Sequence, residues 1–408
     1  MENLFKEEIN KKLKNIVFID LKEEYKLGEV KLPAKFSLPI KLDYLIEGIK
    51  EKELEEEINL EKIVDAMIYL LGIDADFKYS QEYKKILKKI DIDLKNYSMH
   101  KAFINQEKDP LDSYIYLKGY EEVVGEDKDI IFKEANILEA LYNKIANQEE
   151  KYEESQKLLN IIIKKYNEVL NIDENYSLAY YRLAYINLSL EKYIKANMYF
   201  ERFINLSKNE ELKDEVRKEI EIIRNNVNYD SAKTYLSYGE YDKALNLLEN
   251  ISEDFNKDES FYYIYAITFY NMGDLYQAEY YAKLSMEKKI SEENVNLLAT
   301  LYAGNKEFTK AIEILKTGLE ELENSYPLNY NLAIIYLNAN KREEALRYLE
   351  KANQVRPNKE LEDFIKTIKN YWQLKKKIVS YNSCQKRQLL YFFKTKKSIK
   401  KIKKTVDR

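Results

Sequence analysis

The sequence predicts an all-α protein: an α-solenoid of helix–turn–helix repeats, with a small, mostly helical N-terminal region and a C-terminal capping helix. Three observations predict this class. Alanines recur in pairs at a nearly constant interval, and large apolar residues flank them at helical spacing. The 408 residues include only 9 Gly and 5 Pro, so residues that interrupt helices are scarce. The chain is 45% hydrophobic, which is enough for an extensive core.

The alanine pairs define the repeat unit. Each pair is spaced by twelve residues, and both members advance along the chain by 48, 34, 33 and 34. A small side chain at these positions would let two helices cross closely. Glycine or asparagine lies between most of the paired alanines, and both residues tolerate the left-handed conformation that ends a helix. The pairs are Ala184 and Ala196, Ala232 and Ala244, Ala266 and Ala278, Ala299 and Ala311, and Ala333 and Ala345.

One segment carries the pattern most fully. In residues 326–359, it consists of Leu332, Ala333, Tyr336, Ala345, Leu349, Ala352 and Pro357. With these residues the chain resembles the tetratricopeptide repeat family, although the signature tryptophan is replaced by Tyr180 and Tyr262 in two units. The resemblance implies a right-handed superhelix, a general role as a binding scaffold, and a concave groove that is lined by the first helix of each unit.

The repeat divides the chain into four parts. About seven units are expected in residues 95–359, with the best in 177–359. The interval of 48 contains charged, helix-favouring residues over 208–225, which predicts lengthened helices there. Residues 1–94 lack the repeat; we expect an extended segment at 28–40 and helices at 42–50, 60–71 and 81–90. An amphipathic helix over 360–380 would cap the solenoid, and residues 381–408 form a basic tail.

The charge is concentrated at the C-terminus. Residues 375–408 carry a net charge of +12 and the rest of the chain −16, although the whole chain carries only −4. We predict a basic amphipathic helix that could bind an anionic membrane surface or an acidic protein. A helix that docks on the solenoid or is solvated is the structural alternative, and nucleic acid is the partner that the sequence favours least. The predicted contact residues are Lys394, Lys396, Lys397, Lys400, Lys401, Lys403 and Lys404.

The resemblance also assigns candidate residues to the groove. They lie three before, one after or four after the first alanine of each pair, and tyrosine is frequent among them. Because tyrosine combines a wide apolar face with a polar tip, these positions would suit an extended peptide or an amphipathic helix. The alternative is that these tyrosines simply pack the solenoid. The candidate residues are Tyr181, Tyr185, Tyr229, Lys233, Tyr263, Tyr270, Asn296, Thr300 and Tyr330.

Composition limits the chemistry. One Cys and one His exclude a thiolate zinc site, a disulfide framework and a histidine metal cluster, and no phosphate-binding glycine motif occurs. We therefore expect no catalytic residues, metal or cofactor, and predict a protein or peptide as the partner. No signal sequence or membrane span is apparent in the sequence, so we expect a cytoplasmic protein. The heavy use of Lys, Ile, Asn and Tyr with little Ala and Gly suggests an AT-rich bacterial genome. Two alternatives to a groove scaffold stay open: a membrane-surface adaptor tethered by the tail, and a sensor or enzyme in residues 1–94.

Overall fold

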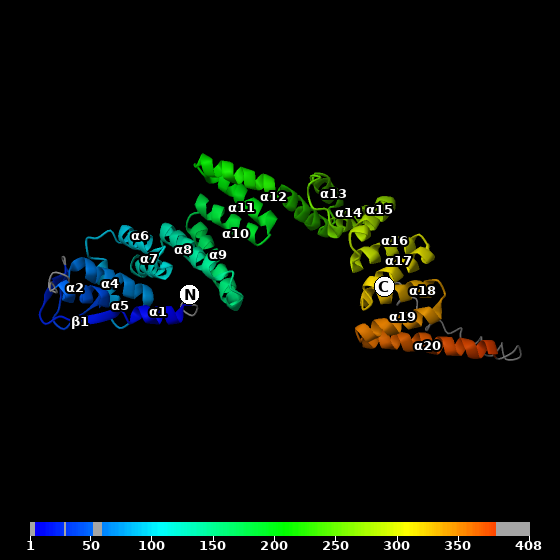
Figure 1. The fold of residues 1–408 in the computed structure, drawn as a ribbon, viewed down its shortest axis with the longest axis horizontal. Helices are drawn as coiled ribbons and strands as arrows, with labels where there is room; N and C mark the ends of the chain where they lie inside the picture. Colours follow the sequence, from blue (N-terminus) through cyan, green and yellow to red (C-terminus); the bar gives the residue numbers. More distant parts are fainter. Residues whose placement is uncertain (1–4, 28–29, 52–58, 381–408) are drawn as a thin grey trace. The chain divides into compact units, whose positions relative to one another are not determined.

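A computed structural model of the protein describes residues 5–27, 30–51 and 59–380 (Figure 1). The chain divides into two compact units, Met1–Ile223 and Arg224–Arg408, and each is described by itself. The basic tail at 381–408 lies outside the described residues, so its predicted helix and lysine contacts stay predictions.

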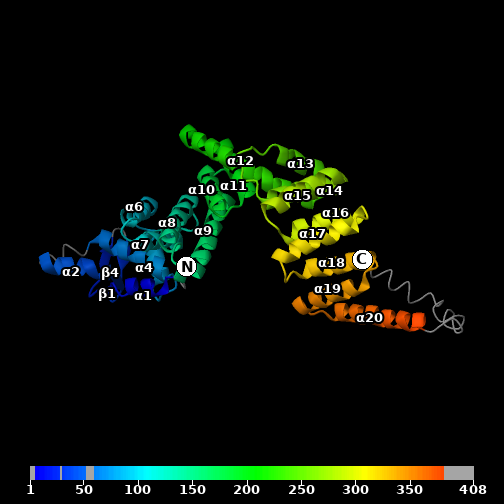
Figure 2. The same cartoon turned by 45° about the vertical axis from the view of Figure 1, so that its right-hand side comes forward.

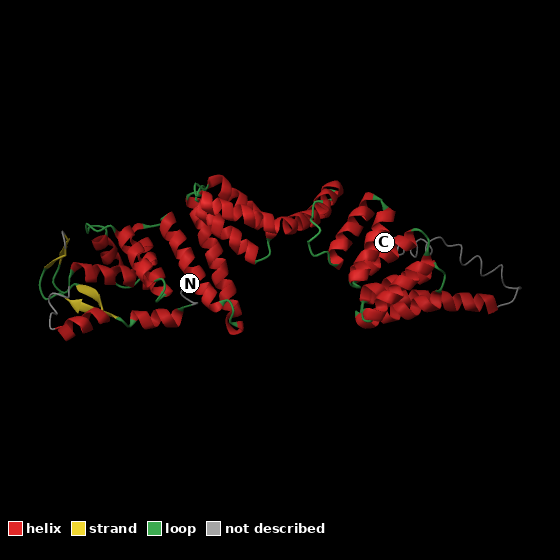
Figure 3. Cartoon of the chain, turned by 45° about the horizontal axis from the view of Figure 1, so that its top comes forward, coloured by secondary structure: helices red, strands yellow, loops and turns green. Residues whose placement is uncertain are grey.

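Unit 1 begins with a mixed segment of helix and strand. Helix α1 (Lys6–Leu13) precedes β1 (Ile16–Asp20), which pairs antiparallel with β4 (Ser37–Lys41) so that Phe18 faces Pro39. A second pair joins β2 (Tyr25–Leu27) to β3 (Val30–Leu32), and α2 (Leu42–Glu51) follows β4 directly (Figure 3). The predicted extended segment at 28–40 therefore contains β3 and most of β4. The alternating sequence did not reveal their partners β1 and β2.

The rest of unit 1 is helical. One hydrophobic cluster extends from Ile16 to Ile186, so residues on both sides of the expected boundary at 94/95 share it. The predicted helices at 42–50, 60–71 and 81–90 correspond to α2, α4 and α5. After α2, the helices in order are α4 (Leu60–Ile73), α5 (Ser80–Leu87), α6 (Leu94–Asn105), α7 (Pro110–Val124), α8 (Lys128–Ile145), the short η1 (Glu149–Lys151), α9 (Tyr152–Ile172), α10 (Ser177–Ser189) and α11 (Tyr193–Leu206).

Unit 2 contains the most regular repeats. Helix α12 (Glu210–Ser237) crosses the division between the units, and it accounts for the 48-residue interval as a lengthened helix, as predicted. Helices α14 to α19 follow as pairs, and α16 contacts both α14 and α18 (Figure 2). The helices after α12 are α13 (Tyr241–Glu249), α14 (Glu259–Met272), α15 (Leu275–Lys288), α16 (Glu292–Gly304), α17 (Phe308–Glu321), α18 (Tyr326–Asn338), α19 (Arg342–Val355) and α20 (Lys359–Ser380).

The paired alanines lie where the sequence placed them, in the interior. All ten are 2% exposed or less. Five of them, from three successive repeats, share one hydrophobic cluster in unit 2. This burial is what the prediction of small side chains at close helix crossings requires.

The turn between paired helices has the same backbone geometry in five repeats. The seventh residue after the first alanine adopts a left-handed conformation, with φ between 56° and 87°. The next residue donates its backbone N–H to the carbonyl five residues earlier, as in the bond of 2.8 Å from Glu307 to Tyr302. The left-handed residues are Glu191, Gly239, Gly273, Lys306 and Asn340. Gly304 is the last residue of α16, and Lys306 rather than this glycine adopts the left-handed conformation.

Helix α20 follows the last repeat. Leu361 and Ile365 are buried in one cluster with Leu349 and Ala352 of α19. The amphipathic pattern of the sequence thus places its apolar residues against the preceding helix, which is the contact that a capping helix needs.

Candidate functional site

The predicted groove residues fall into both units. Tyr181 and Tyr185 belong to α10 in unit 1, and the other seven lie in unit 2. Thr300 and Lys233 are exposed, and the other candidates are half-buried. The structure therefore leaves part of every candidate side chain accessible, but their surroundings differ.

In unit 1 the two tyrosines bind a residue of the same chain. The hydroxyls of Tyr181 and Tyr185 both donate to Glu215 Oε1, at 2.9 and 2.8 Å. Their rings meet edge to face with centroids 4.9 Å apart. Burial and the Glu215 carboxylate raise the pKa of both hydroxyls. Because these hydroxyls already have an acceptor, they are less available to a partner.

The next pair is also engaged. The Lys233 ammonium lies 2.6 Å from Asp230 Oδ1 and 4.5 Å from the centroid of the Tyr229 ring. Tyr229 packs in turn against Phe255 and Phe261. Burial raises the pKa of Tyr229 to about 12. This end of unit 2 therefore offers a packed aromatic surface with an exposed but paired cation.

Helices α14, α16 and α18 form the third part. Tyr263, Tyr270 and Tyr330 are half-buried, and their hydroxyls form no hydrogen bond with the described residues. On α16 between them, Asn296 Oδ1 accepts a bond of 2.8 Å from Asn331 of α18. The Thr300 hydroxyl is directed to the Asn296 carbonyl at 2.7 Å. This layer therefore combines apolar tyrosine faces with hydroxyls that have no internal acceptor.

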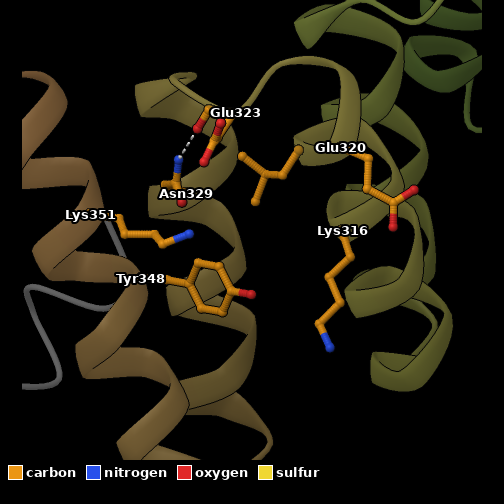
Figure 4. A pocket seen from close by; sticks show the side chains of 7 residues that line it. Lys316, Glu320, Glu323, Asn329, Tyr348 and Lys351 are labelled. Carbon is orange, nitrogen blue, oxygen red and sulfur yellow. Dashed lines mark hydrogen bonds between the residues drawn. The ribbon is translucent and has the colours of Figure 1, made fainter.

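A pocket opens on the other helix layer of the same unit. It has a volume of about 480 Å³ and lies between α17 and α19, with Asn329 of α18 in its wall (Figure 4). Leu319 and the ring of Tyr348 form its apolar part. Charged side chains of both signs surround it, namely Lys316, Glu320, Glu323 and Lys351. Sequence reasoning missed this pocket, because α17 and α19 contribute second helices that the groove prediction did not consider.

Comparison with known families supports the fold. Residues 302–364, which span the end of α16 to the first part of α20, match the tetratricopeptide repeat model. The chain contains tetratricopeptide repeats. The residues that line the pocket lie within this matched segment. Of the helices that carry the tyrosine layer, α18 lies within it, α16 overlaps its start and α14 precedes it. The alanine pairs continue the same repeat toward the N-terminus.

No curated protein matches the chain. Among solved structures, the MamA protein is 14% identical, covers 44% of this chain and 91% of its own, and has a TM-score of 0.33. YrrB, described as a TPR protein with an unusual peptide-binding site, is 17% identical over 62% of this chain and 97% of its own, with a TM-score of 0.26. A tetratricopeptide repeat protein from Parabacteroides merdae is 16% identical over 67% and 98%, with a TM-score of 0.31.

Outside the tetratricopeptide repeats, unit 1 holds a buried polar cluster. Asp65 of α4 is 1% exposed, and the ammonium groups of Lys41 and Lys101 lie 3.0 and 2.9 Å from its two oxygens. The hydroxyls of Tyr97 and Tyr116 donate to the same carboxylate, each at 2.8 Å. A signal for this cluster was present in the sequence, since Asp65 interrupts a run of apolar residues and a buried charge must be paired.

The pKa values in this cluster follow from burial and charge. Burial alone would raise the pKa of Asp65, but the ammonium groups of Lys41 and Lys101 outweigh it, so the pKa lies below the ordinary value. Burial lowers the pKa of Lys41 despite the attraction of Asp65. Perturbed groups of this kind mark functional sites in some proteins. Here each oxygen of Asp65 has partners and no described pocket reaches them, so the arrangement is that of a packed ionic core.

The N-terminal segment contains a cavity of about 80 Å³ that is lined by apolar residues such as Leu38 and Ile63, so it has room for little more than solvent. Within residues 5–27, 30–51 and 59–380, no group of three or more His, Cys, Asp or Glu side chains is placed to hold a metal ion. No helix in those ranges is long and apolar enough to cross a membrane.

Proposed function

We propose that the chain is a non-catalytic scaffold of the cytoplasm that binds a protein or peptide on the layer formed by α14, α16 and α18. The observation that carries this proposal is the set of three half-buried tyrosines, Tyr263, Tyr270 and Tyr330, with hydroxyls that have no acceptor among the described residues. Each could bury its ring against a ligand and donate one hydrogen bond to it. Because helices hold the rings in place, less conformational entropy is lost on binding.

The candidate residues differ in whether their polar groups already have a partner within the chain. Tyr181 and Tyr185 are bonded to Glu215, and Lys233 is paired with Asp230. A partner that used these groups would first have to replace their present contacts. Asn296 and Thr300 lie on the helix between the free tyrosines, so they would contact the same ligand. The strongest contacts are therefore expected at Tyr263, Tyr270 and Tyr330.

The test is a comparison of paired substitutions. The native partner is first recovered by affinity purification and mass spectrometry, and its binding is then measured with purified proteins. We expect Tyr263→Ala with Tyr270→Ala to weaken binding by about tenfold or more, since each buried aromatic contact contributes about 1 kcal/mol or more. The matched control is Tyr276→Ala with Tyr280→Ala on α15, where the side chains are 79% and 52% exposed.

A second pair of variants separates binding from folding. Tyr263→Phe with Tyr270→Phe keeps both rings and removes only the hydroxyls, and we expect an intermediate loss. Equal binding by the wild type, the alanine pair and the α15 control would exclude this layer as the binding surface.

We also propose, as the second candidate function, that the basic tail attaches the scaffold to an anionic membrane. The net charge of +12 over residues 375–408 supports it, because each lysine near such a surface contributes about 1 kcal/mol. Co-sedimentation with vesicles that contain phosphatidylserine should require Lys394, Lys396, Lys397, Lys400, Lys401, Lys403 and Lys404, and should decline with salt. Binding that does not change when the tail is removed, or when the lipid is neutral, would reject this candidate.

A further inference from the structure

We infer that the pocket between α17 and α19 binds a zwitterionic ligand that carries an N–H donor, namely an α-amino acid or a short peptide. This site lies on the second helices of the repeats and is separate from the tyrosine layer of α14, α16 and α18. The inference can therefore be tested independently of the proposed function.

The first observation is a buried hydrogen-bond acceptor. Asn329 is 1% exposed, and its side-chain amide donates to the carbonyls of Ser325 and Glu323 at 2.8 and 3.2 Å. Both amide hydrogens are thereby used. The oxygen Oδ1 has no partner among the described residues, and it faces the side of the pocket where Lys351 and Tyr348 lie (Figure 4). An unpaired buried acceptor is destabilising, and a ligand N–H that reached Oδ1 would satisfy it.

The second observation is the charge around the pocket. Lys316 and Glu320 lie on α17, whereas Lys351 lies on α19 and Glu323 just beyond the end of α17 (Figure 4). Among the described residues, none of these four side chains forms an ion pair. The nearby Tyr336 hydroxyl raises the pKa of Lys316, and the Lys351 ammonium lies 5.6 Å from the centroid of the Tyr348 ring. Cations and carboxylates therefore surround the opening without neutralising one another.

These two observations select the class of ligand. A simple anion could pair only with Lys316 or Lys351 and a simple cation only with Glu320 or Glu323, so either would leave the charges of the other sign unpaired. A neutral apolar molecule would leave Asn329 Oδ1 without a donor. A zwitterion with an ammonium or amide N–H and a carboxylate can pair with both signs of charge and also donate to Asn329. Leu319 and the Tyr348 ring give an apolar contact for a side chain, and the volume of 480 Å³ is within the usual range for small-molecule sites.

The probe is the tripeptide Gly-Leu-Gly, whose binding to the full chain is measured by calorimetry and by ligand-observed NMR. We expect saturable binding at low-millimolar concentration or better. The N-acetylated and the C-amidated tripeptides should each bind about tenfold more weakly, because each lacks one charged partner. Free leucine distinguishes the two sources: binding equal to that of the tripeptide indicates a free amino acid, and much weaker binding indicates a peptide.

Variants locate the site. Lys351→Met and Glu320→Gln should each weaken tripeptide binding about tenfold, whereas Lys341→Met, at the exposed start of α19, should not change it. Asn329→Leu should abolish binding; because Asn329 also bonds to the backbone, its result counts only if the variant unfolds at the wild-type urea concentration. The inference is overturned if the tripeptide does not bind, if its blocked forms bind equally well, or if Lys351→Met and Glu320→Gln retain wild-type affinity.

Discussion

Lys306 occupies a backbone conformation that suits glycine. Its φ is 64°, and it stands in the turn position that Gly239 and Gly273 occupy in neighbouring repeats. A side chain in this conformation costs roughly 1 kcal/mol. We expect Lys306→Gly to raise the free energy of unfolding by about 0.5–1 kcal/mol, since glycine removes this cost but has more freedom in the unfolded chain. Urea denaturation followed by circular dichroism measures the change.

The control for this prediction is Lys310→Gly, four residues later inside α17. There the backbone is helical, so glycine should lower the free energy of unfolding by about 1 kcal/mol. Gly273→Ala should also destabilise, because φ is 87° at that position. If both lysine-to-glycine variants shift stability in the same direction, strain at Lys306 is not the cause.

Glu134 should make the stability of unit 1 depend on pH. Its side chain is fully buried, and burial raises its pKa to about 7 although Lys165 bonds to it. Glu121 raises the pKa further, and Lys118 lowers it. Since the folded state holds the proton more tightly than the unfolded chain, this contribution is fully present below about pH 4.5 and is lost as the pH rises to about 7.

Glu134→Gln isolates this effect. The glutamine cannot ionise, so the urea midpoint of the wild type should fall relative to that of the variant between about pH 5 and 7. Glu153→Gln, at an exposed position of α9, serves as the control and should run parallel to the wild type. A constant difference between the wild type and Glu134→Gln across this range would contradict the raised pKa.

At the scale of whole elements, two glycines set the distance between α4 and α7. A Cβ added at Gly119 would lie 2.0 Å from the Ile68 carbonyl oxygen, and one at Gly72 would lie 1.9 Å from that of Ile115. The helix backbones are therefore in direct contact. We expect Gly119→Ala to lower the free energy of unfolding by about 3 kcal/mol or more, because relief requires the two helices to separate.

Gly304→Ala is the matched substitution for Gly119→Ala. Gly304 also lies in a helix, but a Cβ there meets nothing within 4 Å, so alanine should stabilise α16 by up to about 1 kcal/mol. Thermal and urea denaturation of both variants give the comparison. Similar effects of the two substitutions would mean that helix propensity, rather than the contact with Ile68, determines the result.

The sequence predicted the repeats better than the N-terminal segment, and the reason is physical. A repeat places the same residues at the same spacing five times, so the buried alanines stand out without any knowledge of long-range contacts. The contact of α4 with α7 and the pairing of β1 with β4 each occur once and join residues far apart in the chain. Such contacts leave no periodic pattern in the sequence. Gly72 and Gly119 appear there only as isolated glycines within helical runs.

The candidate site was predictable from the sequence only in part. The register of the alanines placed the predicted groove positions on first helices, but it could not show that Tyr181 and Tyr185 bond to Glu215. That contact depends on Glu215, which lies in the N-terminal part of the long α12 helix, before the part of that helix that carries Ala232 and the repeat pattern. Asn329 likewise looked like an ordinary helical residue, because its unpaired oxygen follows from the three-dimensional packing alone.

At the scale of the whole molecule, the described hydrophobic clusters determine which helices a destabilising substitution should affect. One cluster lies entirely in unit 1, and three lie in unit 2. In repeat proteins each unit is stabilised mainly by its neighbours, so a lesion should weaken nearby helices more than distant ones. We expect Gly119→Ala to accelerate amide hydrogen exchange in α4 to α9 and to leave α14 to α19 unchanged.

Gly318→Ala provides the reciprocal lesion in unit 2. A Cβ at Gly318 would lie 2.7 Å from Val295 Cγ1 of α16, so exchange should rise in α16 to α19 and stay unchanged in α4 to α9. Hydrogen-exchange mass spectrometry of both variants resolves these peptides separately. Helix α12 reports on the coupling, because it contains the division between the units. If either substitution accelerated exchange throughout the chain, the two units would unfold as one cooperative block, and the stabilising interactions would have to extend through α12.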